Sequence, residues 1–365
     1  MTAPAPTPVS SHNEWDPLTE VIVGRLEGAT IPEGHVAVRG TIPRALATVM
    51  RGVGGMRYPR FLVKPAQREL DALIGLLEAE GIRVRRPDVL DGRKKIRTPF
   101  WETRGHATAC PRDGFLVIGD EIIETPMAWR CRHHEGLAYR RLFREYHAAG
   151  ARWTISPRPR LADSLYDEDY RPPENGPPSH YIINESEPVF DAADFARCGR
   201  DIFVQQSNVT NQAGIGWLRR HLGERYRIHE IETPCRTPAH IDSTFIPLAP
   251  GKLLVNPDWI VVERLPAFLR KDWDILVAPR PDPVKGPLLS MCSAWLSINV
   301  LMLDEKRVLV EQDQPTLIRA FRDWGFDPVP CPFKHYAAFG GAFHCATLDV
   351  HRTGSLQSYF PSLDD

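Results

Sequence analysis

The residues best placed for chemistry lie in one stretch near the end of the chain, Phe339–Val350. Gly340 and Gly341 give the backbone conformational freedom shortly before Cys345. After this cysteine the apolar positions alternate as they do in a strand. A cysteine between a flexible turn and a strand can be held rigidly and still face an opening, as a thiolate nucleophile requires. Most single cysteines are small inert hydrophobes, so the stretch alone does not decide the function.

Acidic and basic side chains also occur where the chain is expected to turn. His240 and Asp242 stand two apart in a segment expected to be extended, which puts both on one face because strand side chains repeat every second residue. Asp191 and Asp194 lie three apart between aromatic residues, and Asp113 comes just before a buried strand. Each position also has a plain structural explanation, as a turn residue, a helix cap or a surface pair.

These residue types allow more than one chemistry. A cysteine with a histidine and a carboxylate is the nucleophile, base and orienting group of covalent catalysis. His240 and Asp242, joined by Asp191 or Asp194, could instead hold a hard or borderline metal ion. Carboxylates beyond the one that a histidine needs would suit a cation, and a planar guanidinium is the natural ligand of paired carboxylates. The covalent interpretation therefore implies attack of a thiolate on the carbon of a guanidinium.

The composition is that of a soluble globular protein with enough apolar residues for a core of good size. Of 365 residues, 42% are hydrophobic and 25% are charged, and the net charge of −1 argues against general attraction to nucleic acid or to a membrane. The seven cysteines are widely spaced and form no CxxC pair, which disfavours a disulfide framework or a structural zinc site. With no signal peptide and no long apolar run, we expect a cytoplasmic protein. Residues 1–11 are predicted to form a disordered leader.

The elements that must position these residues recur in one order: strand, strand, helix, strand. The clearest helix is 65–81, where four leucines share one face. Residues 25–59 are expected to be loop with one short helix, and 156–185 to be a lid or a surface loop. The other predicted helices are 139–149, 212–222, 265–269 and 315–324, and the predicted strands are 20–24, 82–84, 114–119, 122–126, 151–155, 201–204, 226–231, 253–255, 273–277, 299–303, 308–310, 328–331 and 346–350. This order fits either an open parallel α/β sheet or a closed ring of similar αβ units.

Longer motifs resemble those of a known family. The chain is similar to the amidinotransferase family of the pentein superfamily, in order, from about residue 11 to residue 360. The similar segments are Ser11–Leu18, Glu124–Arg130, Phe190–Asp194, His240–Phe245, Trp295–Arg307 and Gly340–Val350. The resemblance implies a single catalytic domain at 12–365. It also implies the pentein fold, an α/β propeller with five-fold pseudosymmetric αβ modules around a central active site.

The resemblance further implies a reaction. L-arginine donates its amidino group through a covalent amidino-cysteine to an amine acceptor, which gives L-ornithine and a guanidino product without a metal or an organic cofactor. Cys345 is implied as the nucleophile, His240 as the general acid and base, and Asp191 as the partner of His240. The substrate-binding residues implied in the same way are Asp113, Asp242, Ser293 and Arg130.

The chain departs from the family on the acceptor side. Trp259 follows an Asn-Pro-Asp step where glycine amidinotransferase has an arginine that holds a substrate carboxylate, and Ala342 replaces a family glycine. Trp259, Thr237 and Ala239 are expected to line the acceptor pocket, which we expect to be roomier than in the glycine enzyme. The favoured acceptor is a secondary-metabolite amine, as in antibiotic biosynthesis, with inosamine phosphate, lysine or glycine as further candidates. The protein could form a homodimer. The alternatives to amidino transfer are an arginine deiminase-like guanidino hydrolase and a ligand-binding relative without catalysis.

Overall fold

The computed structural model describes residues 7–287 and 289–363, so the first six residues of the predicted leader lie outside this part of the chain. Residues 7–11 were expected to belong to the same disordered leader, but they are packed into the fold. Val9 and Ser11 are fully buried, and the Ser11 hydroxyl donates a hydrogen bond of 3.1 Å to Asp349. The backbone amide of Ser10 donates to the carbonyl of Val350. The partners of this segment lie near the other end of the chain, which is why its own composition does not reveal its order.

The described part of the chain forms five three-stranded sheets and one two-stranded sheet. In each three-stranded sheet the middle strand pairs antiparallel with one neighbour and parallel with the other. A helix crosses over between the two parallel strands, because parallel neighbours cannot be joined by a tight turn. The expected repeat of strand, strand, helix and strand is therefore present, and no single open parallel sheet is formed.

Each of the five units consists of three strands, named in their order across the sheet, and a crossover helix. The first is β17 (Thr347–Arg352), β1 (Leu18–Val23) and β2 (Arg83–Arg85), with α3 (Arg60–Ala79). The second is β5 (Phe115–Ile118), β6 (Glu121–Glu124) and β7 (Arg152–Ile155), with α5 (Gly136–Ala148). The third is β8 (Phe195–Cys198), β9 (Asp201–Val204) and β10 (Arg227–Glu230), with α6 (Gln212–Leu222). The fourth is β11 (Phe245–Ala249), β12 (Lys252–Val255) and β13 (Asp274–Val277), with α7 (Ala267–Asp272). The fifth is β14 (Leu301–Met302), β15 (Arg307–Glu311) and β16 (Asp327–Cys331), with α8 (Pro315–Asp323).

The remaining elements lie between these units. They are α1 (Val36–Arg39), α2 (Arg44–Val53), the short α4 (Pro111–Gly114) and the hairpin of β3 (Lys95–Arg97) and β4 (Glu102–Arg104). The two helices α1 and α2 correct the expectation of a single short helix in 25–59. Helix α3 begins five residues before the predicted start at Pro65, so this proline lies inside the helix rather than in its first turn. The helix tolerates the lost hydrogen bond because its apolar face, including Leu70 and Leu73, is fully buried.

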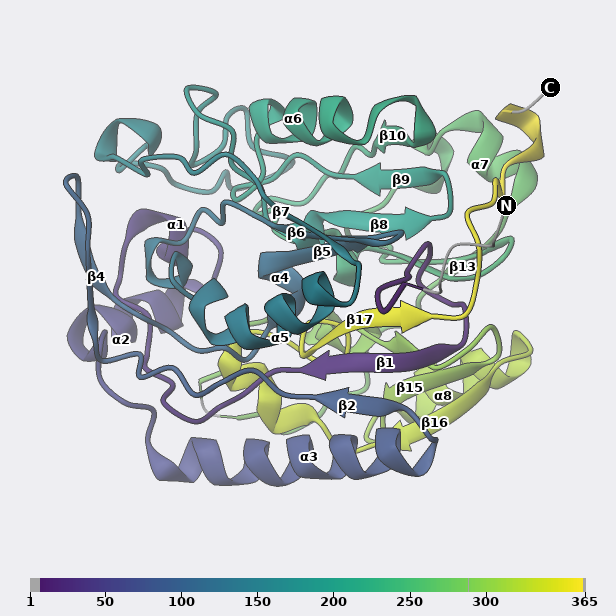
Figure 1. Ribbon diagram of the computed structural model, residues 1–365, viewed down its shortest axis with the longest axis horizontal. Helices are drawn as coiled ribbons and strands as arrows, with labels where there is room; N and C mark the ends of the chain where they lie inside the picture. The colour runs from purple at the N-terminus through teal and green to yellow at the C-terminus, as the bar shows by residue number, and fades with distance from the viewer. Residues whose placement is uncertain (1–6, 288, 364–365) are drawn as a thin grey trace.

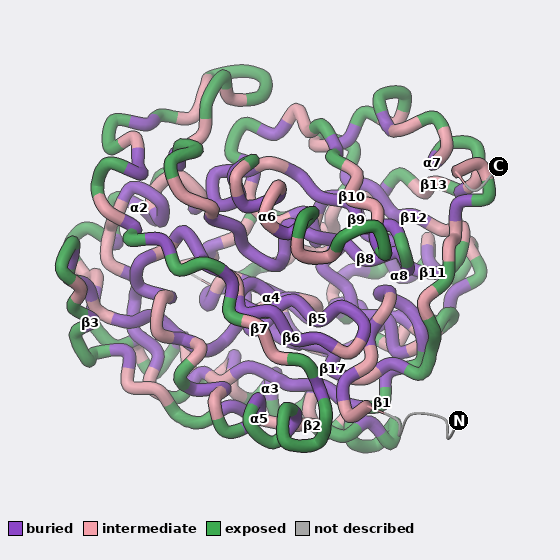
Figure 2. Tube along the Cα trace, turned by 45° about the horizontal axis from the view of Figure 1, so that its top comes forward, coloured by how far each residue is buried: buried purple, intermediate pink, exposed green. Residues whose placement is uncertain are grey.

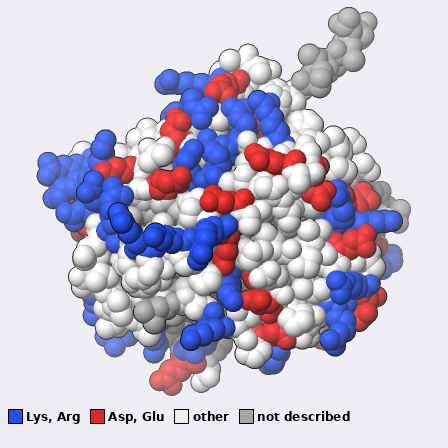
Figure 3. All heavy atoms as spheres, turned by 90° about the horizontal axis from the view of Figure 1, so that it is seen from below, with Lys and Arg blue, Asp and Glu red and all other residues white. Residues whose placement is uncertain are grey.

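The helices cover the outside and the strands fill the interior. Figure 1 shows α3 and α6 along opposite edges of the molecule with the sheets between them. Figure 2 shows that the buried stretches gather in the centre and that the exposed ones lie mainly in outer loops and on helix surfaces. Both signs of charge are spread over the face seen in Figure 3. No helix within 7–287 or 289–363 is both long and apolar enough to span a bilayer.

A buried ionic network joins the two ends of the chain beneath the centre of the fold. The Arg197 guanidinium, only 1% exposed, donates to Glu14 and to Asp349, both at 2.7 Å, and also to the Ser11 hydroxyl. Arg352 donates to the same Asp349 carboxylate at 2.6 Å. Because each buried charge has opposite charges beside it, the network can hold the N-terminal segment against β17. Strand β17 begins two residues after Cys345, so the network also fixes the position of this cysteine.

Candidate active site

A cavity of about 750 Å³ collects the residues that the sequence singled out. All the predicted site residues except Arg130 line it, namely Cys345, His240, Asp191, Asp113, Asp242, Ser293, Thr237, Ala239 and Trp259. They come from segments that are far apart in the sequence, so the fold and not a local motif brings them together. The 156–185 loop, expected to be a lid or a surface loop, contributes residues 172 and 174–176 to the wall.

Cys345 is held at the end of the turn that follows the 3₁₀ segment Lys334–Phe339. Its amide donates to the Asn299 side chain at 3.1 Å, and its Sγ donates to Asp242 Oδ2 at 3.2 Å. Gly341 allows this close packing, because a Cβ there would lie 2.4 Å from the Cβ of Cys345. Burial, followed by the carboxylates of Asp242 and Asp113, raises the pKa of the Cys345 thiol well above its ordinary value. Before a cation binds beside it, this cysteine is therefore a thiol.

The carboxylate beside Cys345 belongs to a buried chain of charges. His344 Nδ1 lies 2.8 Å from Asp242 Oδ2, the oxygen that also accepts from Cys345, and His344 Nε2 lies 3.2 Å from Glu14. Burial raises the pKa of Asp242, but the hydrogen bond and charge of His344 outweigh it, so the pKa is lower than usual. Asp242 is therefore an anion, and the His344 imidazole holds the same oxygen that accepts from Cys345.

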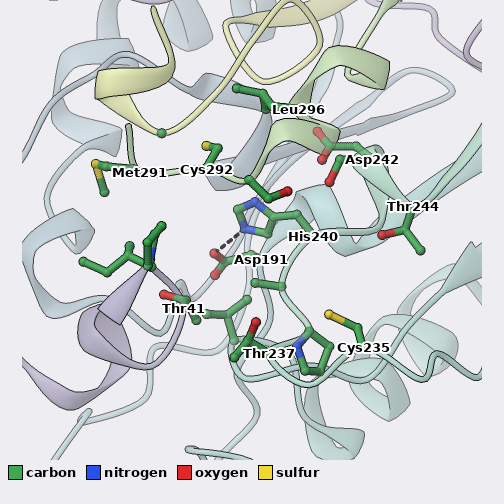
Figure 4. Close-up of a pocket in the computed structure, with 18 of the residues that line it drawn as sticks. Thr41, Asp191, Cys235, Thr237, His240, Asp242, Thr244, Met291, Cys292 and Leu296 are labelled. Atoms are coloured by element: carbon green, nitrogen blue, oxygen red, sulfur yellow. Dashed lines mark hydrogen bonds and ion pairs between the residues drawn. The ribbon is translucent and has the colours of Figure 1, made fainter. Parts of the chain in front are cut away.

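His240 adopts a backbone conformation that is rare for a residue with a side chain, with φ of 60°. The segment after it is a 3₁₀ turn, Ile241–Ser243, which corrects the expected extended segment; His240 and Asp242 nevertheless line the same cavity. His240 Nε2 lies 3.0 Å from Asp191 Oδ2 (Figure 4). His240 Nδ1 lies 3.6 Å from Asp113 Oδ1. Burial lowers the pKa of His240, but these two carboxylates outweigh it and raise the pKa to about 10. The ring is therefore an imidazolium at neutral pH.

Asp113 is placed by the short helix α4, directly before β5, as the sequence indicated. Its Oδ2 accepts from Arg132, whose guanidinium also donates to Glu135 at 2.8 and 2.9 Å. Asp113 Oδ1 is buried and has no hydrogen-bond partner within the described residues. Burial raises the pKa of Asp113 against the opposing charges of His240 and Arg132. Asp113 Oδ1 lies 3.6 Å from His240 Nδ1, too far for a hydrogen bond, so it can accept one from a ligand in the cavity.

Asp194 has a different place from Asp191. It is fully buried and is not among the residues that line the cavity. Its carboxylate accepts from Gln205 at 2.9 Å and from Ser207 and Thr210, both at 2.6 Å. It thereby braces the turn that carries Asp191, whose amide donates to the Thr210 hydroxyl.

Within 7–287 and 289–363 no group of three or more His, Cys, Asp or Glu side chains is placed to hold a metal ion.

Arg130 lies outside the cavity wall, unlike the other predicted substrate-binding residues. Its guanidinium donates to the Leu161 carbonyl at 2.8 Å and to Asp163 at 2.7 Å, and it stacks over Trp101 and Tyr166. These contacts anchor the beginning of the 156–185 loop to the fold. Arg132, two residues further along, does line the cavity.

No family model matches the chain, but individual proteins do. It is 44% identical over 353 residues to the L-arginine:L-lysine amidinotransferase of Pseudomonas savastanoi pv. phaseolicola, covering 97% of each chain. The chain belongs to the amidinotransferase family. Among solved structures, it is similar to SxtG, an amidinotransferase of the saxitoxin biosynthetic pathway from Microseira wollei, with 51% identity, a TM-score of 0.91 and coverage of 97% of this chain and 100% of that one. The inosamine-phosphate amidinotransferase of Streptomyces griseus is 38% identical, with a TM-score of 0.86 and the same coverage.

The amidinotransferase has the α/β pentein fold. Besides the two amidinotransferase structures, a dimethylarginine dimethylaminohydrolase matches over 91% of this chain and 99% of its own, with a TM-score of 0.57. Its 13% identity makes this a likeness of fold alone. Of the two architectures that the strand order left open, the single parallel sheet is therefore wrong, and the separate αβ units are confirmed.

Several residues of the amidinotransferase site were missed from the sequence. They are Arg132, Glu135, His344, Glu14 and Asn299. His344 and Glu14 both lie within motifs that carried the resemblance. His344 directly precedes Cys345, whereas Glu14 lies near the start of the chain. Nothing local marks Glu14 as part of the site, because its contact with His344 spans 330 positions.

Proposed function

We propose that this amidinotransferase takes the amidino group of L-arginine, holds it on Cys345 and passes it to the amine of a second substrate. The observation that carries the proposal is the placement of the Cys345 thiol within 3.2 Å of Asp242, in a cavity that also holds the His240–Asp191 pair. Thiol, anions and imidazolium together are the groups that this reaction needs. The relative named L-arginine:L-lysine amidinotransferase supports arginine as the donor.

In the first half-reaction, Asp113 and Asp242 bind the guanidinium of arginine. Asp113 Oδ1, which accepts no hydrogen bond from the described residues, and the negative charge of Asp242 suit a planar cation with several N–H donors. The positive charge of the guanidinium offsets the carboxylates that raise the pKa of Cys345, so the thiol loses its proton to solvent when the donor is bound. The sulfur attacks the guanidinium carbon and the bond from that carbon to the ornithine nitrogen breaks. The His240 imidazolium gives its proton to the departing amine, and Asp191 keeps the ring in position.

In the second half-reaction, the acceptor amine replaces ornithine. His240, now neutral, removes a proton from the amine as its nitrogen attacks the amidino carbon. The carbon–sulfur bond breaks and the departing thiolate takes up a proton from solvent, which restores the Cys345 thiol and the His240 imidazolium of the resting enzyme. Water in place of the amine would release urea from the amidino-cysteine. If ammonia left instead of ornithine in the first half-reaction, water would then release citrulline, as in an arginine deiminase-like hydrolase. The family relatives favour transfer over both forms of hydrolysis.

We further propose that the five αβ units surround this site with five-fold pseudosymmetry, since their strand orders are alike and their loops meet at one cavity. Ser293 is proposed as a ligand of the donor's α-carboxylate. We propose that the acceptor side of the cavity is lined by Thr237, Ala239 and Trp259. Because similar proteins include amidinotransferases of saxitoxin and inosamine-phosphate chemistry, the favoured acceptor is a secondary-metabolite amine.

The adduct on Cys345 is the test of this function. Purified protein is incubated with L-arginine alone, quenched in acid and digested, and the peptide that contains Cys345 is expected to carry an amidino group while ornithine is released. Cys345→Ala is expected to lose both the adduct and transfer to any amine. Cys292→Ala is the matched control, because Cys292 also lines the cavity. Transfer by Cys345→Ala at the wild-type rate would overturn the covalent route, and citrulline as the product would favour hydrolysis.

A further inference from the structure

The charges of the cavity are divided between its interior and its mouth. Asp113, Asp191 and Asp242 are buried. Arg44 and Arg236, which line the same cavity, are exposed, and Arg39 is half-buried. We call these three arginines the rim arginines. The cavity thus presents anions where the reacting cation is proposed to bind and cations nearer to solvent.

The rim arginines are held in place without being neutralised. Arg39 donates to the Gly34 carbonyl at 2.6 Å, and Arg236 donates to the Pro173 carbonyl at 2.7 Å. Arg44 donates to the Pro172 carbonyl at 3.5 Å. Across 7–287 and 289–363, no carboxylate lies within 4.0 Å of any of the three guanidinium groups. A backbone carbonyl fixes the direction of a guanidinium but leaves its net charge for another partner.

None of the other charged side chains described in the cavity wall neutralises the three rim arginines. Arg132 is already paired with Asp113 and Glu135. Asp258 accepts from the Trp295 indole at 2.8 Å and lies 3.5 Å from Arg280. Glu174, which also lines the cavity and is exposed, is a single carboxylate against three rim arginines.

Two of the rim arginines converge on one side of the mouth. Arg44 and Arg236 bond consecutive carbonyls of the 172–173 segment, so both guanidinium groups lie beside it. The loop that carries Arg236 is tied to the turn of Trp259, because the Thr233 hydroxyl donates to the Trp259 carbonyl at 2.8 Å. Arg236 therefore belongs to the same wall as Trp259, the residue at which the acceptor side of the cavity departs from the glycine enzyme.

We infer that the rim arginines form a subsite for an oxyanion, a carboxylate or a phosphate, on a substrate whose other end is the reacting guanidinium or amine. This inference rests on the proposed function for the identity of the reacting end. Opposite charges at the two ends of the cavity orient such a molecule and reject one that is cationic at both ends. The oxyanion can come from the donor, as the α-carboxylate of arginine, or from the acceptor.

The donor is tested by binding, which does not require transfer. Isothermal titration of the Cys345→Ala protein compares L-arginine with agmatine, which is arginine without the α-carboxylate. Arg236→Gln and Arg44→Gln, each added to Cys345→Ala, are expected to weaken arginine binding about tenfold, the cost of one charge-assisted hydrogen bond, and to leave agmatine binding within about twofold. Arg220→Gln is the control, because Arg220 is exposed on α6 and does not line the cavity.

The acceptor is tested by transfer with wild-type cysteine. L-lysine is compared with 1,5-diaminopentane, which is lysine without its carboxylate, and a phosphorylated amino alcohol with the free alcohol. If the acceptor brings the oxyanion, the same arginine variants lower kcat/KM about tenfold only for the amines that carry a carboxylate or a phosphate. A selective loss in either comparison supports the subsite and assigns the oxyanion to donor or acceptor. Equal losses for the compounds with and without the carboxylate or phosphate, or no loss in either comparison, would overturn the proposed subsite. Failure of the proposed function is distinct, since the wild-type protein would then form no amidino adduct on Cys345 with L-arginine.

Discussion

Replacing Asp242 by Asn should move two properties of the site in opposite directions. The substitution keeps the shape of the side chain and removes only its charge. Before substrate binds, Asp242 Oδ2 lies 3.2 Å from Cys345 Sγ and contributes to the raised pKa of the thiol. Two unit charges at that separation repel by about 5 kcal/mol at an effective dielectric constant of about 20, which sets an upper limit to the relief. The thiol of the variant should therefore ionise at a lower pH.

The same substitution should slow transfer. If Asp242 binds the guanidinium as proposed, the variant loses one preorganised charged contact, which is worth about 2–4 kcal/mol in the transition state. At about 1.4 kcal/mol for each factor of ten, kcat/KM for arginine should fall roughly thirty- to a thousandfold. A more reactive thiol together with a slower enzyme is a combination that simple misfolding does not produce.

Two assays follow the two effects. Alkylation of Cys345 by iodoacetamide, read by peptide mass in a Cys292→Ala background, is measured against pH and should be about tenfold faster for Asp242→Asn at any pH below the thiol pKa. Transfer is measured with arginine varied at a fixed acceptor concentration. Thermal unfolding checks that the variant is folded, since Asp242 also accepts from His344 at 2.8 Å. Slower alkylation, or a loss of kcat/KM of less than threefold, would show that Asp242 is not placed between the thiol and the guanidinium in the way argued.

Three further outcomes test the supports of the site. Gly341→Ala would put a Cβ 2.4 Å from that of Cys345 and 2.9 Å from Cys110 Sγ, so we expect transfer to fall at least about tenfold and about 1–3 kcal/mol of unfolding free energy to be lost; wild-type kinetics would contradict this. Arg197→Met would remove one of the two arginines that pair with both Glu14 and Asp349, Arg112 being the other, and denaturant unfolding should show a loss of about 3–5 kcal/mol; a loss under about 1 kcal/mol would mean that the remaining arginines suffice. The pKa of His240 is raised to about 10 in the fold against about 6.5 in an unfolded chain, so the stability it contributes is complete below about pH 6.5 and is lost as the pH rises through about 10. His240→Gln should flatten the fall of the unfolding temperature over that range, and an unchanged slope would mean that the imidazolium is not stabilised by its carboxylates.

The sequence predicts elements well where one face of a helix is apolar. Helix α6 has the predicted bounds Gln212–Leu222, and α5 and α8 agree with prediction to within a few residues. Four strands were missed: β3 and β4 of the hairpin, and β8 and β11 of the three-stranded sheets. β8 (Phe195–Cys198) contains the fully buried Arg197, which breaks the expected polarity pattern, and β11 (Phe245–Ala249) is buried throughout and contains Pro247. Neither strand shows alternation, because partners on both sides bury each of them.

The site was predictable in its reacting groups and not in its supports. Cys345 stands out because glycines and a strand surround it, and His240 stands out because of its nearby carboxylate. Arg132 and Glu14 carry no such signal, since an arginine in a loop and a glutamate near the start of the chain are ordinary surface residues by type. Their roles depend on burial and on contacts with Asp113 and His344 that only the folded chain creates.

The acidity around Cys345 would at first count against a thiolate nucleophile, because a negative neighbour makes a thiol harder to ionise. The resting site nevertheless holds the proton that the departing amine needs, because His240 is charged while Cys345 is neutral, unlike a preformed thiolate–imidazolium pair in which both groups are charged. His240 becomes the base for the second half-reaction once it has given up that proton. A cation placed between Asp113, Asp242 and the sulfur removes the obstacle to ionisation, and a neutral molecule does not. Selectivity for a guanidinium then lies in the ionisation step as well as in binding. For this reason Asp242→Asn, which frees the thiol from that control, separates thiol reactivity from transfer more clearly than removal of the cysteine itself.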